Sequence, residues 1–174
     1  SFEITDIPLI EYVASKQKPI IISTGIAGKE DIDLAVKTCK DTGNNQVILL
    51  KCTSQYPSQP KDANLLTIVD LAKSYNVISG LSDHTLGIEA PIVSVSLGGK
   101  VIEKHFILNK NIGGPDAHFS LDEGEFKQMV EAVRTAEQIL GRIDYELNDE
   151  KLKSREFSRS LFVSDDMKEG EIIT

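Results

Sequence analysis

Two histidines follow short apolar runs, and each has a polar residue two positions before it. Ser82 precedes His84, and Glu103 precedes His105. Because side chains alternate along a strand, each pair shares one face. If the two strands are neighbours, about 4.8 Å apart, both imidazoles can reach one metal ion. Two nitrogen ligands leave positions for water and substrate, which is typical of a catalytic metal.

Other side chains at the ends of apolar runs allow different chemistry. Lys51 could form a Schiff base, or it could lie in the helix layer and extend its ammonium group to solvent. The stretch GGPDAHFS (113–120) could carry Asp116 over the site, or it could be an ordinary turn. His118 is expected to be a loop residue. The two paired histidines themselves could be hydrogen-bonded structural residues.

Apolar runs with strand character alternate with amphipathic segments along the chain. The predicted strands are 19–24, 46–52, 76–83 and 100–106, and the predicted helices are 6–18, 29–43, 63–75, 87–98 and 122–141. This alternation predicts an α/β fold with a parallel sheet, whose polar strand ends meet at one edge. The first strand is so apolar that we expect it to be buried on both faces.

The repeat of one strand and one helix in ~25–30 residues is that of a (β/α) barrel, which needs ~250 residues when complete. Residues 1–141 therefore predict the C-terminal half of a (β/α)8 TIM barrel. A doubly wound open sheet is the alternative, although no G-x-G-x-x-G follows any of the predicted strands. A polar linker is expected over 142–158. Residues 159–174 have strand, turn and strand character and predict the start of a small β-rich domain.

Composition excludes several classes of protein. The net charge of −8 argues against a nucleic-acid or anionic membrane surface. No apolar run approaches the ~20 residues that cross a bilayer, and the chain opens without a signal-peptide pattern. Cys39 and Cys52 form no C-x-x-C pair, so we expect core cysteines in a cytoplasmic protein.

Several motifs in this order and spacing resemble the sialic acid synthase family. They are STG (23–25), KCTSQYP (51–57), GLSDHT (80–85), VIEKHF (101–106), GGPD (113–116) and SRSLFV (158–163). The resemblance implies a (β/α)8 barrel followed by an antifreeze-like (SAF) domain, of which 159–174 would be the start. It also implies a domain-exchanged homodimer. ISTGIA (22–27) and FSL (119–121) look most like the pseudaminic acid synthase branch.

The resemblance also implies a reaction and a set of site residues. The family condenses phosphoenolpyruvate with an N-acylated amino sugar, releases phosphate and forms a nine-carbon 2-keto sugar acid. The implied metal ligands are His84 and His105, holding Mn²⁺, with Mg²⁺ or Co²⁺ as alternatives. The residues implied to contact phosphoenolpyruvate are Ser1, Ser23, Ser54 and Ser82, and those implied to contact the sugar are Tyr56, Glu103 and Asp116. Glu103 would also move protons, and Phe119 would either meet the sugar or anchor its loop.

Two other functions are compatible with the residues alone. The first is a Schiff-base barrel aldolase that uses Lys51, which a chelator would not inhibit. The second is a non-catalytic carbohydrate-binding barrel in which the histidines are structural. Metal binding and phosphate release distinguish both from the synthase.

Overall fold

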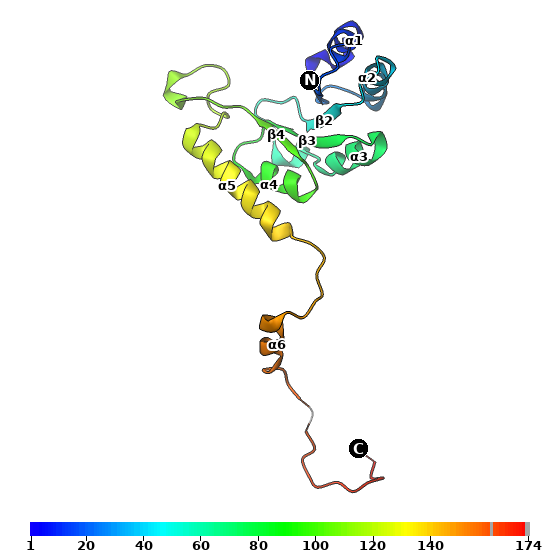
Figure 1. Cartoon of the computed structure of the whole chain (residues 1–174). Coiled ribbons are helices and arrows are strands. Elements are labelled where there is room, and N and C mark those ends of the chain that lie inside the picture. The colour runs from blue at the N-terminus through cyan, green and yellow to red at the C-terminus, as the bar shows by residue number, and fades with distance from the viewer. Residues whose placement is uncertain (161, 173–174) are drawn as a thin grey trace. The chain divides into compact units, whose positions relative to one another are not determined.

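The computed structural model describes residues 1–160 and 162–172 (Figure 1). The chain divides into two compact units, Ser1–Gly141 and Arg142–Thr174. Leu161, Ile173 and Thr174, which belong to the predicted antifreeze-like segment, lie outside the described residues.

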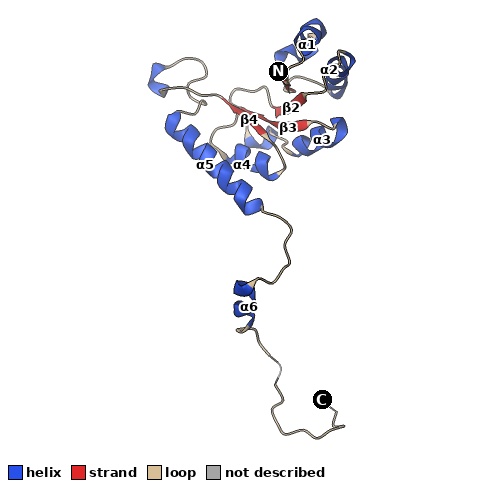
Figure 2. Ribbon diagram, in the orientation of Figure 1, coloured by secondary structure: helices blue, strands red, loops and turns tan. Residues whose placement is uncertain are grey.

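The first unit is built on a parallel sheet of β1 (Ile20–Ser23), β2 (Val47–Cys52), β3 (Ile78–Asp83) and β4 (Val101–Lys104). The strand order is β1-β2-β3-β4, so strands consecutive in sequence are neighbours in the sheet (Figure 2). The four predicted strands are confirmed. All four carboxyl ends lie at one edge of the sheet.

Helices alternate with the strands as predicted. They are α1 (Ile7–Ala14), α2 (Lys29–Asp41), α3 (Leu66–Tyr75), α4 (Glu89–Ser96) and α5 (Glu123–Leu140), with 3₁₀ turns at Phe2–Thr5, Pro60–Asp62 and Lys110–Ile112. Capping side chains fix where two helices begin. Asp6 accepts a hydrogen bond from the Leu9 N–H, and Asp122 forms a capping box with Glu125.

Alternation along the strands gives the sheet two different faces. Ile20 and Ile22 of β1 pack with Val47 and Leu49 of β2 against buried residues of α1 and α2. This is the helix-covered face. The opposite, inner face is open at the edge strand, where Ile21 is 51% exposed. The prediction that 19–24 is buried on both faces is therefore wrong, because no described element covers Ile21.

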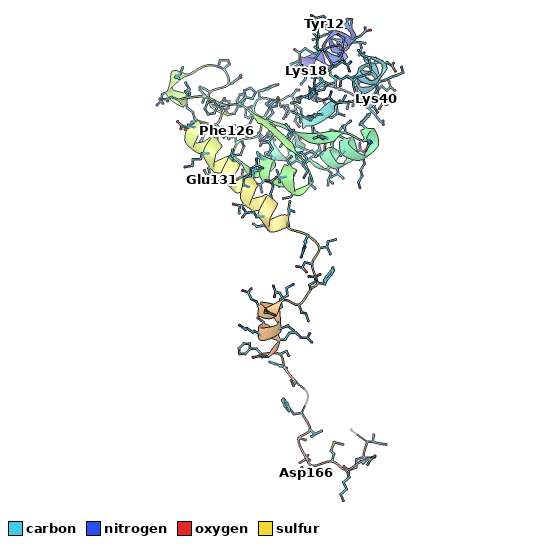
Figure 3. The ribbon with its side chains drawn as sticks, viewed as in Figure 1. Tyr12, Lys18, Lys40, Phe126, Glu131 and Asp166 are labelled. Atoms are coloured by element: carbon cyan, nitrogen blue, oxygen red, sulfur yellow. The ribbon has the colours of Figure 1, made fainter. Side chains whose placement is uncertain are left out.

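The long helix α5 is amphipathic, as its sequence predicts. Met129 and Val133 are buried, and Phe126, labelled in Figure 3, packs partly buried against the same cluster. Glu131 lies on the opposite, exposed face, where its carboxylate pairs with Lys127. Glu137 of the same helix is also exposed to solvent.

The second unit differs from its prediction. The stretch 142–158 contains a helix, α6 (Asp149–Arg155), whose N-cap Asn148 accepts a hydrogen bond from the Lys151 N–H. The described residues of 159–172 contain no strand, so the expected strand–turn–strand pattern is not found there. Phe162 is 87% exposed. A two-stranded pair is marginal without further strands or packing against a helix, and the described part of this unit contains no strand with which residues 159–172 could pair.

Within the part of the chain that the structure describes, no helix combines the length and the apolar character needed to span a bilayer.

Candidate active site

The candidate site lies at the carboxyl ends of β3 and β4. Ser82 and Glu103 are register partners, and the Ser82 hydroxyl donates to Glu103 Oε1 at 2.7 Å. Two residues further along each chain, the imidazoles of His84 and His105 lie with ring centroids 5.1 Å apart, inclined by 65°. The predicted sharing of faces is therefore confirmed, and two side chains from each strand meet in one place.

The orientation of the buried His84 ring is set by the end of β2. Its Nδ1 lies 2.9 Å from the Thr53 carbonyl oxygen, which can only accept, so Nδ1 carries the proton. Cys52 Sγ, 3.8 Å from Nδ1, is the more distant neighbour. Burial lowers the pKa of His84, but the contacts with Cys52 and Thr53 outweigh it, so the net pKa lies above its ordinary value. In the neutral ring, Nε2 is free to bind a metal.

His105 is held from the loop that follows β4. Its Nδ1 lies 3.6 Å from Asp116 Oδ2, and its ring meets Phe119 edge-on at 5.0 Å. Burial and the nearby charge of His84 lower the pKa of His105, against the opposing effect of Asp116 and Glu103. The ring is therefore favoured in the neutral form that ligates metals.

Aromatic rings enclose the histidine pair. The Tyr56 centroid lies 4.2 Å from that of His84 and 5.9 Å from that of His105. Burial raises the pKa of Tyr56, so its phenol stays protonated and can donate a hydrogen bond. Phe119 is only 3% exposed. Its burial favours the expectation that it anchors the loop, and contact with the sugar stays a prediction.

Two of the serines implied to bind phosphoenolpyruvate, Ser1 and Ser54, form a second group of polar side chains besides the histidines, Ser82 and Glu103. Ser1 Oγ lies 2.8 Å from Ser54 Oγ. Ser1 and Ser23 line a pocket of about 310 Å³ together with Glu103. The structure thus links each of the predicted site residues to at least one other, either through a contact or through this shared pocket.

Gly25 makes room for the serine cluster. A Cβ at this position would lie 2.1 Å from Ser54 Oγ, 2.7 Å from Ser1 Oγ and 2.9 Å from Cys52 Sγ. These distances are too short for any real contact. The absence of a side chain at Gly25 is therefore what lets the two hydroxyls and the thiol converge.

We expect Gly25→Ala to push the Ser54 hydroxyl out of place while the protein still folds, because a serine side chain can rotate away. Loss of one hydrogen bond to a charged ligand costs about 1.5–3 kcal/mol, or roughly 10–100-fold in affinity. If these serines bind phosphoenolpyruvate, as the family resemblance implies, its KM in the full-length protein should rise by this factor. Gly28→Ala is the matched control, because its Cβ would meet only Asp31 Oδ2 at 3.6 Å. Equal KM values for the two variants would contradict this role of Gly25.

The histidine pair fits a divalent metal ion. The 5.1 Å separation of the rings brings two nitrogens within reach of one ion at a bond length of about 2.1 Å. Each ring also has an oxygen partner that can orient it, Thr53 for His84 and Asp116 for His105. Among the described residues, no group of three or more His, Cys, Asp or Glu side chains could hold a metal. The described residues thus offer His84 and His105 as two candidate ligands.

The last residues of β2, Lys51 and Cys52, lie on opposite faces of the sheet. Lys51 donates to the Cys52 carbonyl at 2.7 Å, and by alternation it lies on the helix-covered face with Leu49, away from the histidines. Cys52 is buried as predicted, but it lies on the floor of the site beside His84. Sequence reasoning missed this position and the Thr53 carbonyl. The two-residue spacing of Cys52 and Ser54 was the available signal for Cys52.

The sequence of this chain is similar to those of known proteins along its whole length. The chain is 48% identical over 174 residues to a pseudaminic acid synthase of Campylobacter jejuni, which covers 100% of this chain and 51% of that protein. It is 47% identical over 175 residues to a pseudaminic acid synthase of Helicobacter pylori, covering 100% and 52%. The chain thus spans about half the length of the curated relatives it matches.

A solved structure and a family model agree with these relatives. The structure of the N-acetylneuraminic acid (sialic acid) synthetase from Leptospira borgpetersenii matches with a TM-score of 0.81 and 33% identity, over 89% of this chain and 54% of that one. The parallel sheet and its helices are therefore the half-barrel that the sequence predicts. The family model described as the NeuB family matches residues 1–145. With the fold, the full-length relatives and this match in agreement, the chain belongs to the NeuB family.

Proposed function

We propose that the protein carrying this chain condenses phosphoenolpyruvate with an N-acylated amino sugar and releases phosphate, giving a nine-carbon 2-keto sugar acid. One observation carries the proposal. The histidine pair stands directly beside the Ser82–Glu103 hydrogen bond at the ends of neighbouring strands, in a chain of the NeuB family. Two imidazoles, a hydroxyl and a carboxylate thus lie close together, which suits a metal-assisted reaction between an anionic and a carbonyl substrate.

His84 and His105 would hold the divalent ion, which we expect to be Mn²⁺, with Mg²⁺ or Co²⁺ as alternatives. When bound, this ion supplies Lewis-acid polarisation of the sugar aldehyde. The hydrogen bond from His84 Nδ1 to Thr53 fixes the ring that presents Nε2, and Tyr56 covers both rings and limits the access of water.

The four serines are proposed to bind phosphoenolpyruvate. Ser1 and Ser54 already share a hydrogen bond at 2.8 Å, so one hydroxyl proton of this pair remains free to donate to an anion. Ser23 lines the same pocket as Ser1. Ser82 donates a hydrogen bond to Glu103, whose side chain lines this pocket. Neutral donors of this kind hold a carboxylate or phosphate in fixed orientation.

Tyr56, Glu103 and Asp116 are proposed to contact the sugar. The carboxylates of Glu103 and Asp116 would accept hydrogen bonds from sugar hydroxyls or amides, and the half-exposed ring of Tyr56 offers an apolar face and a phenol. Glu103 is also placed to move a proton, because its side chain faces the histidine pair from the position two residues before His105.

The bond changes follow from the two substrates. C3 of phosphoenolpyruvate attacks the aldehyde carbon, water adds at C2, and the C2–O bond to the phosphate group breaks. One water is consumed, and inorganic phosphate and a 2-keto acid are formed. Phosphoenolpyruvate labelled with ¹⁸O at the bridging oxygen should therefore release all of the label in phosphate. Label retained in the keto acid would overturn this proposal.

The proposed acceptor is 2,4-diacetamido-2,4,6-trideoxy-altropyranose. The resemblance of ISTGIA and FSL to the pseudaminic branch supports it, and so do the two relatives named as pseudaminic acid synthases. The labelled phosphate release should be faster with this sugar than with N-acetylmannosamine. A preference for N-acetylmannosamine would move the acceptor to the sialic acid type and leave the bond cleavage unchanged.

The position of Lys51 weakens the Schiff-base aldolase, because its ammonium group lies on the helix-covered side of β2. A carbohydrate-binding barrel without catalysis would release no phosphate in the labelling experiment. The antifreeze-like domain begun at 159 and the domain-exchanged homodimer stay predictions that rest on the family resemblance.

A further inference from the structure

A buried ion pair lies directly behind the two histidines. Lys104 Nζ approaches Asp83 Oδ2 to 2.6 Å, and the two side chains are 1% and 2% exposed. Asp83 and Lys104 immediately precede His84 and His105 in sequence, so alternation places the pair on the opposite side of the strands from the imidazoles. The proposed reaction does not use either charge.

The ion pair is the last connection between β3 and β4 before the histidines. Asp83 and Lys104 are register partners at the carboxyl ends of the two strands. His84 and His105 follow one residue beyond this final paired position. No hydrogen bond of the β3–β4 ladder therefore fixes the backbone of one histidine against the other, and the ion pair is the nearest cross-strand tie.

Thr85 extends this tie to the far side of His84. Its N–H donates to Asp83 Oδ1 at 2.9 Å, its hydroxyl donates to Asp83 Oδ2 at 3.1 Å, and its carbonyl accepts from Lys104 Nζ. The residue before His84 is thus a member of the ion pair, and the residue after it is hydrogen-bonded to both members. The same lysine immediately precedes His105. The pair therefore reaches the backbone beside both imidazoles.

We propose that Asp83 and Lys104 are positioning residues, which with Thr85 set the separation of the His84 and His105 rings. The proposal rests on the proposed function in one respect, namely that these rings hold the metal. Removing two charges from water is costly, and buried ion pairs often stabilise a fold no better than apolar residues of the same size. A positional role accounts for the pair where stability alone does not.

The test replaces both members at once in the full-length protein, as Asp83→Asn with Lys104→Met. This double variant leaves no unpaired buried charge, and asparagine keeps an acceptor for the Thr85 N–H. The matched control is Lys110→Met with Glu125→Gln, because that pair also spans 2.6 Å but lies 36% and 41% exposed between the loop after β4 and α5. Both double variants leave the net charge unchanged.

Two readouts are measured besides thermal unfolding. In the metal-free protein, ¹⁵N–¹H NMR detects the Nδ1–H of His84, which the hydrogen bond to Thr53 protects from exchange. In the wild type this signal should be sharp, and in the Asp83→Asn/Lys104→Met variant it should broaden or vanish. The Kd for Mn²⁺ should rise by about 10–100-fold, as for other residues that orient metal ligands. The control should change neither readout.

Each outcome decides a separate claim. A lower melting temperature with an unchanged ring signal and an unchanged Kd would overturn the positional role and leave a purely stabilising pair. If the wild type binds no Mn²⁺, the metal part of the proposed function is wrong, and the ring signal still decides whether the pair positions His84.

If the double variant does not fold, the Thr85→Val variant is tested instead, because it removes the Thr85 hydroxyl and keeps the ion pair. It should shift both readouts in the same direction by a smaller factor, and no shift would overturn the proposal.

Discussion

Replacing His84 by alanine in the full-length protein is expected to lower kcat by at least about 10³-fold. Lewis-acid activation is worth several kcal/mol, and each 1.36 kcal/mol is a factor of ten in rate. The variant should also bind Mn²⁺ more weakly, because one of the two proposed ligands is lost. Phosphate release with and without added Mn²⁺, together with a metal titration, measures both effects.

The matched control is His118→Ala. His118 is exposed in the loop after β4, and its ring contacts only Phe119 among the aromatic residues described. This variant should keep wild-type kcat and Mn²⁺ affinity. Wild-type turnover of the His84→Ala variant in chelator-treated buffer would show that the histidine pair is structural.

Glu103→Gln is expected to lower kcat by about 10²–10⁴-fold, the range that general acid–base catalysis contributes. Glutamine keeps the size of the side chain and can still accept the Ser82 hydrogen bond, but it cannot take up a proton. The KM for phosphoenolpyruvate should change little. The exposed Glu131→Gln on α5 is the control and should leave kcat unchanged.

A double-mutant cycle with Ser82→Ala separates the two roles of Glu103. If Glu103 only orients Ser82, the single variants should lose similar activity and the double variant no more than either. If Glu103 also moves a proton, Glu103→Gln should cost much more than Ser82→Ala. A loss of activity confined to KM in Glu103→Gln would contradict the catalytic role.

The sequence predicted those parts of the site that depend only on which side chains share one face of a strand. Ser82 with His84 and Glu103 with His105 needed only a two-residue spacing and two parallel strands, and the structure brings all four together. The same rule places Lys104 on the opposite side of its strand from Glu103 and His105. It does not identify Asp83 as the partner of Lys104, because a single sequence does not reveal which buried groups on neighbouring strands face one another across a given register.

Contacts between distant segments were beyond sequence reasoning. The Thr53 carbonyl orients His84 from 31 residues away, and a backbone oxygen leaves no signal in residue type. The sequence allowed Phe119 either to meet the sugar or to anchor its loop in the core, and its burial, which favours the anchor, is visible only in the structure. The helix α6 did carry a signal that was missed, since Asn148 precedes acids at its start and Lys153 and Arg155 lie in its last turn.

The most direct test of the central claim is pulsed electron paramagnetic resonance of Mn²⁺ bound to the full-length protein with ¹⁵N-labelled histidine. The account predicts hyperfine coupling to two histidine nitrogens, reduced to one nitrogen in His105→Ala and unchanged in His118→Ala. Spectra without any histidine coupling, or with coupling unaffected by the loss of His105, would show that the metal is not held by the His84–His105 pair.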